Sequence, residues 1–329
     1  MPAVDVLLVE GREELIALDA ATGERLWSLP AAPGFALRGS DLFFSEPPDE
    51  HGGALVRAEA ATGEVRFRRR LRGAPHPAKL WPLSRGVLRG VPGEGVALVD
   101  EAGVLRFRVK LPGGEPACAI ETREALVLGQ KGFCVGVDPT DGAVLWKRRM
   151  ALRELVACGP HVLLLESTSL VCLTPGTGKV VLRAAVPAEC HGLRIHADAA
   201  HLVAPGAVLS LSLQTLAVRK EHPLPWARHL AADHEPDSLI ATGDGGAAAS
   251  LSRKRWSIES DGSPPLPAQQ RRGVVLLSRR LNELYALDSG LLLASLPKGD
   301  AILCDDLSCL IRDGETLSAH RLVSHLALL

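Results

Sequence analysis

The sequence predicts an all-β protein, a closed β-propeller of four-stranded antiparallel blades, from three observations. A short motif recurs along the chain at roughly 40-residue intervals, the period of a four-stranded propeller blade. In each copy an alternating apolar run, a turn and a second apolar run follow one another, as in a β-hairpin. The 329 residues are 47% hydrophobic and 23% charged, a composition that folds and excludes disorder as the main state.

The copies are placed by the position equivalent to Asp19, and eight of them are found. These positions are Asp19, Glu59, Asp100, Asp138, Thr174, Ser212, Ser252 and Asp288, with a weaker copy near His320. We therefore expect one propeller domain over residues 1–329 with eight blades, seven or nine being the alternatives. Residues 300–329 are expected to close the ring beside an N-terminal strand at 4–9, because closure removes exposed sheet edges, and to add a short decoration.

A bulky apolar residue follows the turn glycine of the motif at a constant distance. The glycines are Gly23, Gly63, Gly103, Gly142 and Gly178, and the residues four positions later are Trp27, Phe67, Phe107, Trp146 and Leu182. Glycine suits a turn with positive φ, and a large side chain at a fixed offset from it can bury against the neighbouring blade. The motif is thus predicted to be structural.

The pattern Ala17-x-Asp19-x-x-Thr22-Gly23-x-x-x-Trp27 resembles the tryptophan-docking repeat of the PQQ-like, quinoprotein-type β-propeller family, and residues 138–146 carry a close second copy. The resemblance implies the fold for nearly the whole chain. Quinone-dependent dehydrogenases of the family are longer and carry a calcium-assisted cofactor site, often with adjacent cysteines, whereas this sequence has no Cys-Cys pair. We expect a noncatalytic member without a cofactor.

The chain start and the cysteines favour a cytoplasmic protein. The first residues lack the basic start and long apolar core of a secretory signal, and no apolar run reaches the length that spans a bilayer. A lipid-anchored relative of the family would need a cysteine near its start, and the first here is Cys118. The seven cysteines lie mostly in apolar strand-like runs, as free thiols in a reducing compartment do.

Two groups of residues are weighed as metal sites. Cys304, Cys309, His320 and His325 have the residue types of a tetrahedral zinc site, which would need a turn or a helix over 316–329 to bring each pair together. The alternative, which we favour, is two buried strand cysteines and two surface histidines. The remaining sets are His191, His196 and His201, and His222, His229 and His234, for which exposed histidines are the expectation. No catalytic, cofactor-binding or metal residue is assigned.

Cations concentrate in the predicted last strands of successive blades. They are Arg66, Arg68, Arg69, Arg70 and Arg72, then Arg106, Arg108 and Lys110, then Lys147, Arg148 and Arg149, and later Arg219 and Lys220. Last strands lie at the outer rim of a propeller, so we expect a basic band around blades two to four. Charges there either oppose strand addition by another chain or bind an acidic protein. Nucleic acid is disfavoured because base-stacking aromatics are scarce.

The leading functional hypothesis is a cytoplasmic scaffold or adaptor subunit of a larger bacterial assembly, with proteins as partners. No phosphate-binding loop, catalytic triad or zinc-protease motif is present in the sequence. The excess of Arg over Lys is typical of a GC-rich bacterial genome. The alternative is a small-molecule sensor or quinoprotein-like enzyme using the central funnel. The proline-rich loops at 46–53 and 260–267 are further partner-binding candidates.

Overall fold

The computed structural model describes most of the chain. The described residues are 6–10, 13–19, 24–47, 53–70, 79–91, 93–130, 132–231, 239–251, 256–263, 268–271, 274–279, 281–286, 291–296, 298, 300–303, 308–313 and 316–321. The chain divides into two compact units. Unit 1 comprises Met1–Asp19, Glu24–Val162 and Leu173–Lys179, and unit 2 comprises Ala20–Gly23, Leu163–Cys172 and Val180–Leu329.

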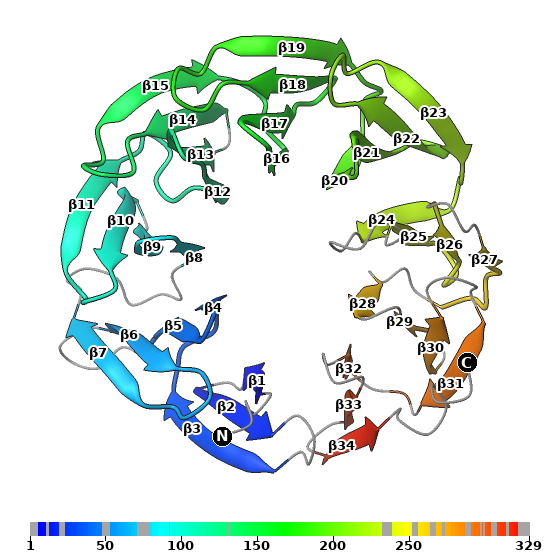
Figure 1. Ribbon diagram of the computed structural model, residues 1–329, viewed down its shortest axis with the longest axis horizontal. Coiled ribbons are helices and arrows are strands. Elements are labelled where there is room, and N and C mark those ends of the chain that lie inside the picture. The colour runs from blue at the N-terminus through cyan, green and yellow to red at the C-terminus, as the bar shows by residue number, and fades with distance from the viewer. Residues whose placement is uncertain are drawn as a thin grey trace. The chain divides into compact units, whose positions relative to one another are not determined.

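Unit 1 contains one three-stranded and three four-stranded antiparallel sheets (Figure 1). Its strands are β1 (Val6–Glu10), β2 (Glu14–Asp19) and β3 (Arg25–Pro30); β4 (Phe35–Arg38), β5 (Asp41–Ser45), β6 (Ala54–Glu59) and β7 (Val65–Arg70); β8 (Leu80–Leu83), β9 (Gly86–Val91), β10 (Gly95–Asp100) and β11 (Leu105–Lys110); and β12 (Cys118–Glu121), β13 (Leu126–Gln130), β14 (Phe133–Val137) and β15 (Val144–Arg149). The next sheet along the chain is β16 (Glu154–Cys158), β17 (His161–Leu165), β18 (Ser169–Leu173) and β19 (Val180–Ala185).

Unit 2 continues with three four-stranded sheets and a three-stranded one. Its strands are β20 (His191–His196), β21 (Ala199–Ala204), β22 (Ala207–Ser212) and β23 (Val218–Pro223); β24 (Ala227–Ala231), β25 (Ile240–Gly243), β26 (Ala248–Ser250) and β27 (Ser257–Ile258); β28 (Gln269–Arg271), β29 (Val274–Ser278), β30 (Asn282–Ala286) and β31 (Leu292–Leu296); and β32 (Asp300–Leu303), β33 (Ser308–Asp313) and β34 (Thr316–Arg321).

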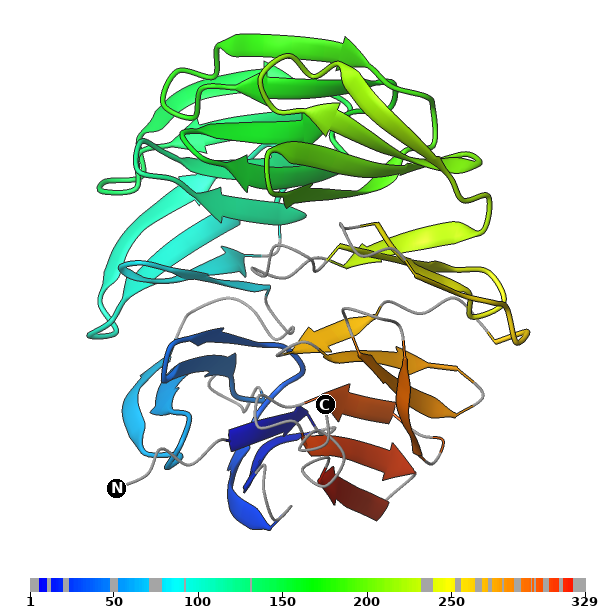
Figure 2. The same cartoon turned by 45° about the vertical axis from the view of Figure 1, so that its right-hand side comes forward.

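Within each unit the sheets are arranged as blades. First strands of successive sheets contact each other, as β4 contacts β8 in unit 1 and β20 contacts β24 in unit 2. In Figure 2 the cyan sheet β8–β11 of unit 1 lies beside the green sheet β12–β15. The second and third strands are buried on both faces, for example β9 with β10 and β21 with β22. Fourth strands occur at the end of each sheet order and are edge strands.

The aromatic residue of each motif in unit 1 packs against the turn glycine of the next sheet. Trp27 packs on Gly63, Phe67 on Gly103, Phe107 on Gly142 and Trp146 on Gly178. The indole N–H groups of Trp27 and Trp146 donate to the carbonyls of Ala60 at 3.1 Å and Pro175 at 2.5 Å. The predicted contact between the bulky residue and the neighbouring sheet is therefore confirmed for these four residues, and the contact of Leu182 stays a prediction.

A β-bulge recurs in these hairpins just before the turn. The pairing of third and fourth strands shifts at Ala17/Leu18, Arg57/Ala58, Leu98/Val99 and Gly136/Val137 in unit 1, and at Ser210/Leu211 and Leu284/Tyr285 in unit 2. An extra residue on one strand increases the local twist and re-aims the side chains that follow. The constant bulge thus gives the bulky residue four positions after the turn glycine, called the docking residue below, the same position in each sheet.

Leu216 departs from the glycine pattern. It occupies the turn-glycine position after β22, has φ of 57° and is 1% exposed. The preceding sheet carries Leu182 where Trp146 and Trp27 stand in other repeats, so the smaller docking residue coincides with a larger turn residue. The leucine side chain at this turn is thus buried, although its backbone has a left-handed conformation that only glycine adopts without strain.

The described residues confirm an all-β fold of four-stranded antiparallel sheets, and among them seven sheets have four strands and two have three. The helix considered over 316–329 is wrong for its first part, because β34 pairs with β33 through residues 316–321. Apolar Leu317 and Ala319 alternate with polar Ser318 and His320, which fits a strand. Eight blades, a single domain and ring closure stay predictions.

Candidate functional site

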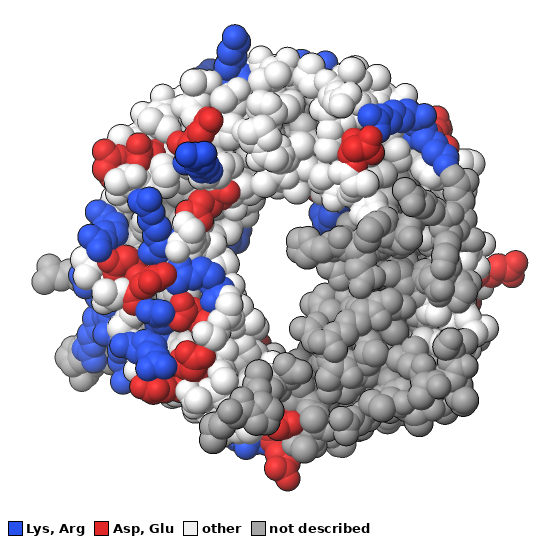
Figure 3. Space-filling model, in the orientation of Figure 1, with Lys and Arg blue, Asp and Glu red and all other residues white. Residues whose placement is uncertain are grey.

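The fourth strands of unit 1 carry a basic edge, defined here as the exposed Arg and Lys side chains of β7, β11 and β15. Its members are Arg66, Arg68, Arg69, Arg70, Arg106, Arg108, Lys110, Lys147, Arg148 and Arg149. Figure 3 shows blue side chains gathered over the region of β7 and β11, with red ones among them. The predicted exposure of these cations is confirmed, and Arg72 lies outside the described residues.

Some cations of the basic edge are neutralised by acids of their own sheet. Arg66 pairs with Glu64 at 3.0 Å, Arg68 with Glu46 at 2.8 Å and Arg106 with Asp100 at 2.5 Å. In the described part of the chain, six members have no ion pair: Arg69, Arg108, Lys110, Lys147, Arg148 and Arg149. Glu64 and Asp100 lie at the hairpin turns that precede β7 and β11, whereas Glu46 lies beside Ala54 at the start of β6.

A buried cation lies beside the basic edge. Ala97 of β10 is opposite Arg89 of β9 and opposite Arg108 of β11, so the two arginines share one face of the sheet. Arg89 is 4% exposed, and its Nε lacks a hydrogen-bond partner. Burial lowers the pKa of Arg89; Glu115 opposes this shift, and the Arg108 charge lowers the pKa further. The Glu115 side chain lies against Gly90, the residue that follows Arg89 in β9. It accepts a hydrogen bond from the Lys79 backbone N–H at 3.0 Å.

A paired ionic network joins sheets β4–β7 and β8–β11 near a pocket of about 540 Å³. Asp41 accepts hydrogen bonds from Arg38 at 2.9 Å and Arg57 at 2.8 Å, and Arg38 also donates to Glu101 at 2.5 Å. Burial raises the pKa of Asp41, but the two guanidinium groups outweigh this and hold it below its usual range. Arg38 further donates to the Leu83 carbonyl at 2.7 Å. These charges satisfy one another, so the network serves packing between sheets.

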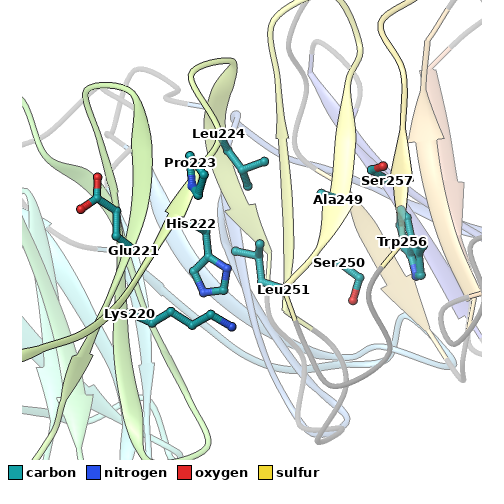
Figure 4. A pocket seen from close by; sticks show the side chains of 10 residues that line it. All are labelled: Lys220, Glu221, His222, Pro223, Leu224, Ala249, Ser250, Leu251, Trp256 and Ser257. Atoms are coloured by element: carbon teal, nitrogen blue, oxygen red, sulfur yellow. The ribbon is translucent and has the colours of Figure 1, made fainter.

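Unit 2 contains a pocket of about 320 Å³ between β23 and the strands β26 and β27 (Figure 4). Its walls combine apolar and polar side chains from two sheets. The lining residues are Lys220, Glu221, His222, Pro223, Leu224, Ala249, Ser250, Leu251, Trp256 and Ser257. Of these, only Lys220 and His222 belong to groups that the sequence singled out.

Histidines and a serine form a hydrogen-bonded chain that ends at this pocket. The Nδ1 of His201 on β21 lies 2.9 Å from Ser210 Oγ, which in turn lies 3.4 Å from His222 Nε2. Burial lowers the pKa of His201 to about 4 and also lowers the pKa of His222, so both rings are neutral at pH 7. A hydrogen bond to the His196 backbone opposes the shift of His201, so we take the His201 ring N–H to donate there and Nδ1 to accept the Ser210 hydroxyl. His222 Nε2–H then donates to Ser210.

The structure gives the histidine sets other contacts than a metal. His191 contacts the carbonyls of Glu189 and Arg228, each at 3.0 Å. His201 is buried, so the expectation of exposed histidines is wrong for it; the Ser210 hydroxyl satisfies its ring inside the sheet. Within the described ranges, no three His, Cys, Asp or Glu residues group as a metal site. His234 lies outside those ranges.

The four residues weighed for zinc are only partly described. Cys309 of β33 is the register partner of His320 of β34, so the backbone places this pair opposite one another. Cys304 and His325 lie outside the described residues. Cys118, Cys134 and Cys158 are free thiols, and burial raises the pKa of Cys134 to about 12. In the described part of the chain no helix is long and apolar enough to cross a membrane.

The repeat matches a known protein family model and known structures. Residues 11–154 match the family model described as outer membrane protein assembly factor BamB. The structure of BamB from Moraxella catarrhalis aligns with a TM-score of 0.59 and 14% identity, covering 88% of this chain and 93% of that one. The PQQ-like β-propeller repeat predicted from the sequence is confirmed by this match. Among curated proteins none matches the sequence.

Other solved structures share the fold with similarly low sequence identity. The computationally designed Ika8 protein aligns with a TM-score of 0.64 and 13% identity, covering 88% of this chain and 96% of its own. The dihydro-heme d1 dehydrogenase NirN aligns with a TM-score of 0.61 and 14% identity, covering 91% of this chain and 74% of its own. At these identities the likeness concerns the fold and does not transfer an activity.

Proposed function

We propose that this chain, which carries PQQ-like propeller repeats over residues 11–154, is a noncatalytic adaptor subunit of a cytoplasmic bacterial assembly that binds an acidic protein through its basic edge. Outer membrane protein assembly is the role printed in the description of the matching family, and the matched residues include β7, β11 and β15. The free thiols of Cys118, Cys134 and Cys158 support a reducing compartment.

The observation that carries the proposal is the unpaired part of the basic edge. Arg108, Lys110, Arg148 and Arg149 are exposed on edge strands of neighbouring sheets and have no ion pair among the described residues. Clustered like charges raise the potential over a surface and steer an oppositely charged protein toward it. Arginine also binds carboxylates with paired hydrogen bonds, which gives orientation as well as attraction.

The same charges have a second explanation. An edge strand exposes unpaired backbone N–H and C=O groups, and charged side chains discourage another chain from pairing with it. The two explanations differ in what happens when the charges are removed. Edge protection predicts self-association of the neutralised variant. Partner binding predicts loss of an acidic partner while the variant stays monodisperse.

The experiment is native purification of the tagged protein from its own host, comparing wild type with the triple variant Arg108→Gln, Lys110→Gln, Arg148→Gln. The proposal expects a stoichiometric acidic protein that is retained by wild type at low salt, weakens as salt rises and is lost by the triple variant. Arg183→Gln on β19 is the matched control, because Arg183 is exposed on an edge strand but pairs with Glu166 at 3.3 Å. Retention of the partner by the triple variant would contradict the proposal.

A further inference from the structure

We propose that the pocket between β23 and β26–β27 of unit 2 binds a small organic carboxylate with an apolar body. The pocket is independent of the basic edge and of the adaptor role. It holds about 320 Å³ and opens to solvent between two neighbouring sheets (Figure 4). That volume lies at the lower end of small-molecule sites. Three features of its lining define the ligand class.

The first feature is a buried hydroxyl without a partner. Ser250 of β26 is 3% exposed and lines the pocket, yet its Oγ makes no hydrogen bond. A buried polar atom is unfavourable unless it is hydrogen-bonded. An oxygen of a ligand seated in the pocket would accept the Ser250 hydroxyl and remove this cost.

The second feature is one available cation. Lys220 of β23 is exposed, and no carboxylate among the described residues lies within ion-pair distance of it. Lys220 and His222 alternate with Glu221 along the strand, and Figure 4 shows the Glu221 side chain pointing away from the other two. His222 is neutral and holds its Nε2 toward Ser210 at 3.4 Å. Lys220 is therefore the positive charge that this pocket presents.

The third feature is an apolar wall. Leu224 and Leu251 pack as partly buried side chains on the cluster of Val203, Val208 and Ala227, and the Trp256 indole packs on the neighbouring cluster. Apolar side chains and an indole favour a hydrocarbon or aromatic body. Together with one cation and one hydroxyl, they fit a carboxylate whose other end is apolar.

Benzoate and its neutral analogue benzamide test this assignment on the full-length protein by calorimetry or ligand-observed NMR. We expect wild type to bind benzoate below ~10 mM and at least about tenfold more tightly than benzamide. Lys220→Met should weaken benzoate binding about tenfold without changing benzamide binding. Lys179→Met is the matched control: Lys179 is an exposed lysine that lies outside the pocket and outside the basic edge, and its loss should change neither.

Ser250→Ala provides a second readout. Removing a buried, unpartnered hydroxyl should leave the urea midpoint of the free protein unchanged or raise it, while weakening benzoate binding severalfold. The proposal is overturned if wild type fails to bind benzoate, if benzamide binds equally well, or if Lys220→Met binds benzoate as wild type does. Circular dichroism confirms that each variant is folded, so loss of binding is not read from an unfolded protein.

Discussion

The substitution Gly142→Ala measures the contact that joins one sheet to the next. Gly142 has φ of 78°, and a Cβ added to it would lie 2.6 Å from Cγ and Cδ2 of Phe107. Both atoms belong to a ring that is 7% exposed, so the ring cannot swing into solvent. The substitution therefore imposes two costs, one on the backbone and one on packing.

The two costs are of similar size. A non-glycine residue in the left-handed region costs about 1–2 kcal/mol, and forcing an extra carbon into a packed site costs about 1–3 kcal/mol. We expect Gly142→Ala to lower the free energy of unfolding by about 2–5 kcal/mol. Gly132→Ala isolates the backbone part: Gly132 lies in the same unit, has φ of 84°, and has no atom within 4 Å of its added Cβ.

Urea denaturation followed by tryptophan fluorescence and circular dichroism measures the difference, with coincident transitions required of the two probes. In a Phe107→Ala background the packing cost has no ring to act on, so Gly142→Ala should then cost no more than Gly132→Ala. This double-mutant cycle gives a coupling of about 1–3 kcal/mol. Equal losses for Gly142→Ala and Gly132→Ala in the wild-type background would refute the docking contact.

Three further outcomes are expected. Arg89→Met should raise the free energy of unfolding by about 1–4 kcal/mol in urea titrations, because burial disfavours the Arg89 charge, its Nε has no hydrogen-bond partner and Glu115 compensates only in part. A loss of stability instead would show that Glu115 outweighs the cost of burial. Burial depresses the pKa of His201 to about 4, so between pH 6.5 and 4 the unfolded chain binds more protons than the folded one. The free energy of unfolding of wild type should therefore fall by about 3 kcal/mol as the pH is lowered through that range. His201→Asn should flatten that slope in chemical denaturation at several pH values, and an unchanged slope would count against the assignment. Leu216→Gly relieves the φ strain but empties a buried site, so it should lower the urea midpoint and the free energy of unfolding, the latter by about 2–4 kcal/mol. Adding Leu182→Trp should restore part of this free energy. No recovery in the double variant would exclude the idea that Leu216 compensates for the smaller residue at 182.

The fold was predictable because the residues of the repeat determine local structure, namely a hairpin turn and the position of one bulky side chain after it. Asp138, Gly142 and Trp146 mark a hairpin turn and its docking residue, and a fixed offset between them requires no knowledge of distant contacts. The same holds for the basic edge, because alternation in 105–110 separates Phe107 from Arg106 and Arg108. Short-range patterns of this kind determine sheets, turns and exposed faces.

The pocket was not predictable in this way. Ser250 and Trp256 lie 30 and 36 residues after Lys220, and no periodic pattern in the sequence marks them as neighbours. Their approach depends on how two sheets pack. The buried state of His201 was likewise missed, since Ser210 satisfies it from the adjacent strand. Leu216 did leave a signal, because the glycine of the motif is missing in the repeat that follows Leu182.

The docking contacts also give the chain a direction. In each case the aromatic residue comes first and its glycine follows about 32 to 36 residues later, in the next sheet. A fragment that ends after one complete sheet lacks the next turn glycine, so the aromatic ring of its last sheet is exposed. A fragment that begins with a complete sheet lacks only the preceding aromatic ring, which would have packed on its first turn glycine. Stable excised pieces of unit 1 should consequently extend past the turn of the following repeat, so boundaries drawn at repeat ends would fall in the wrong place.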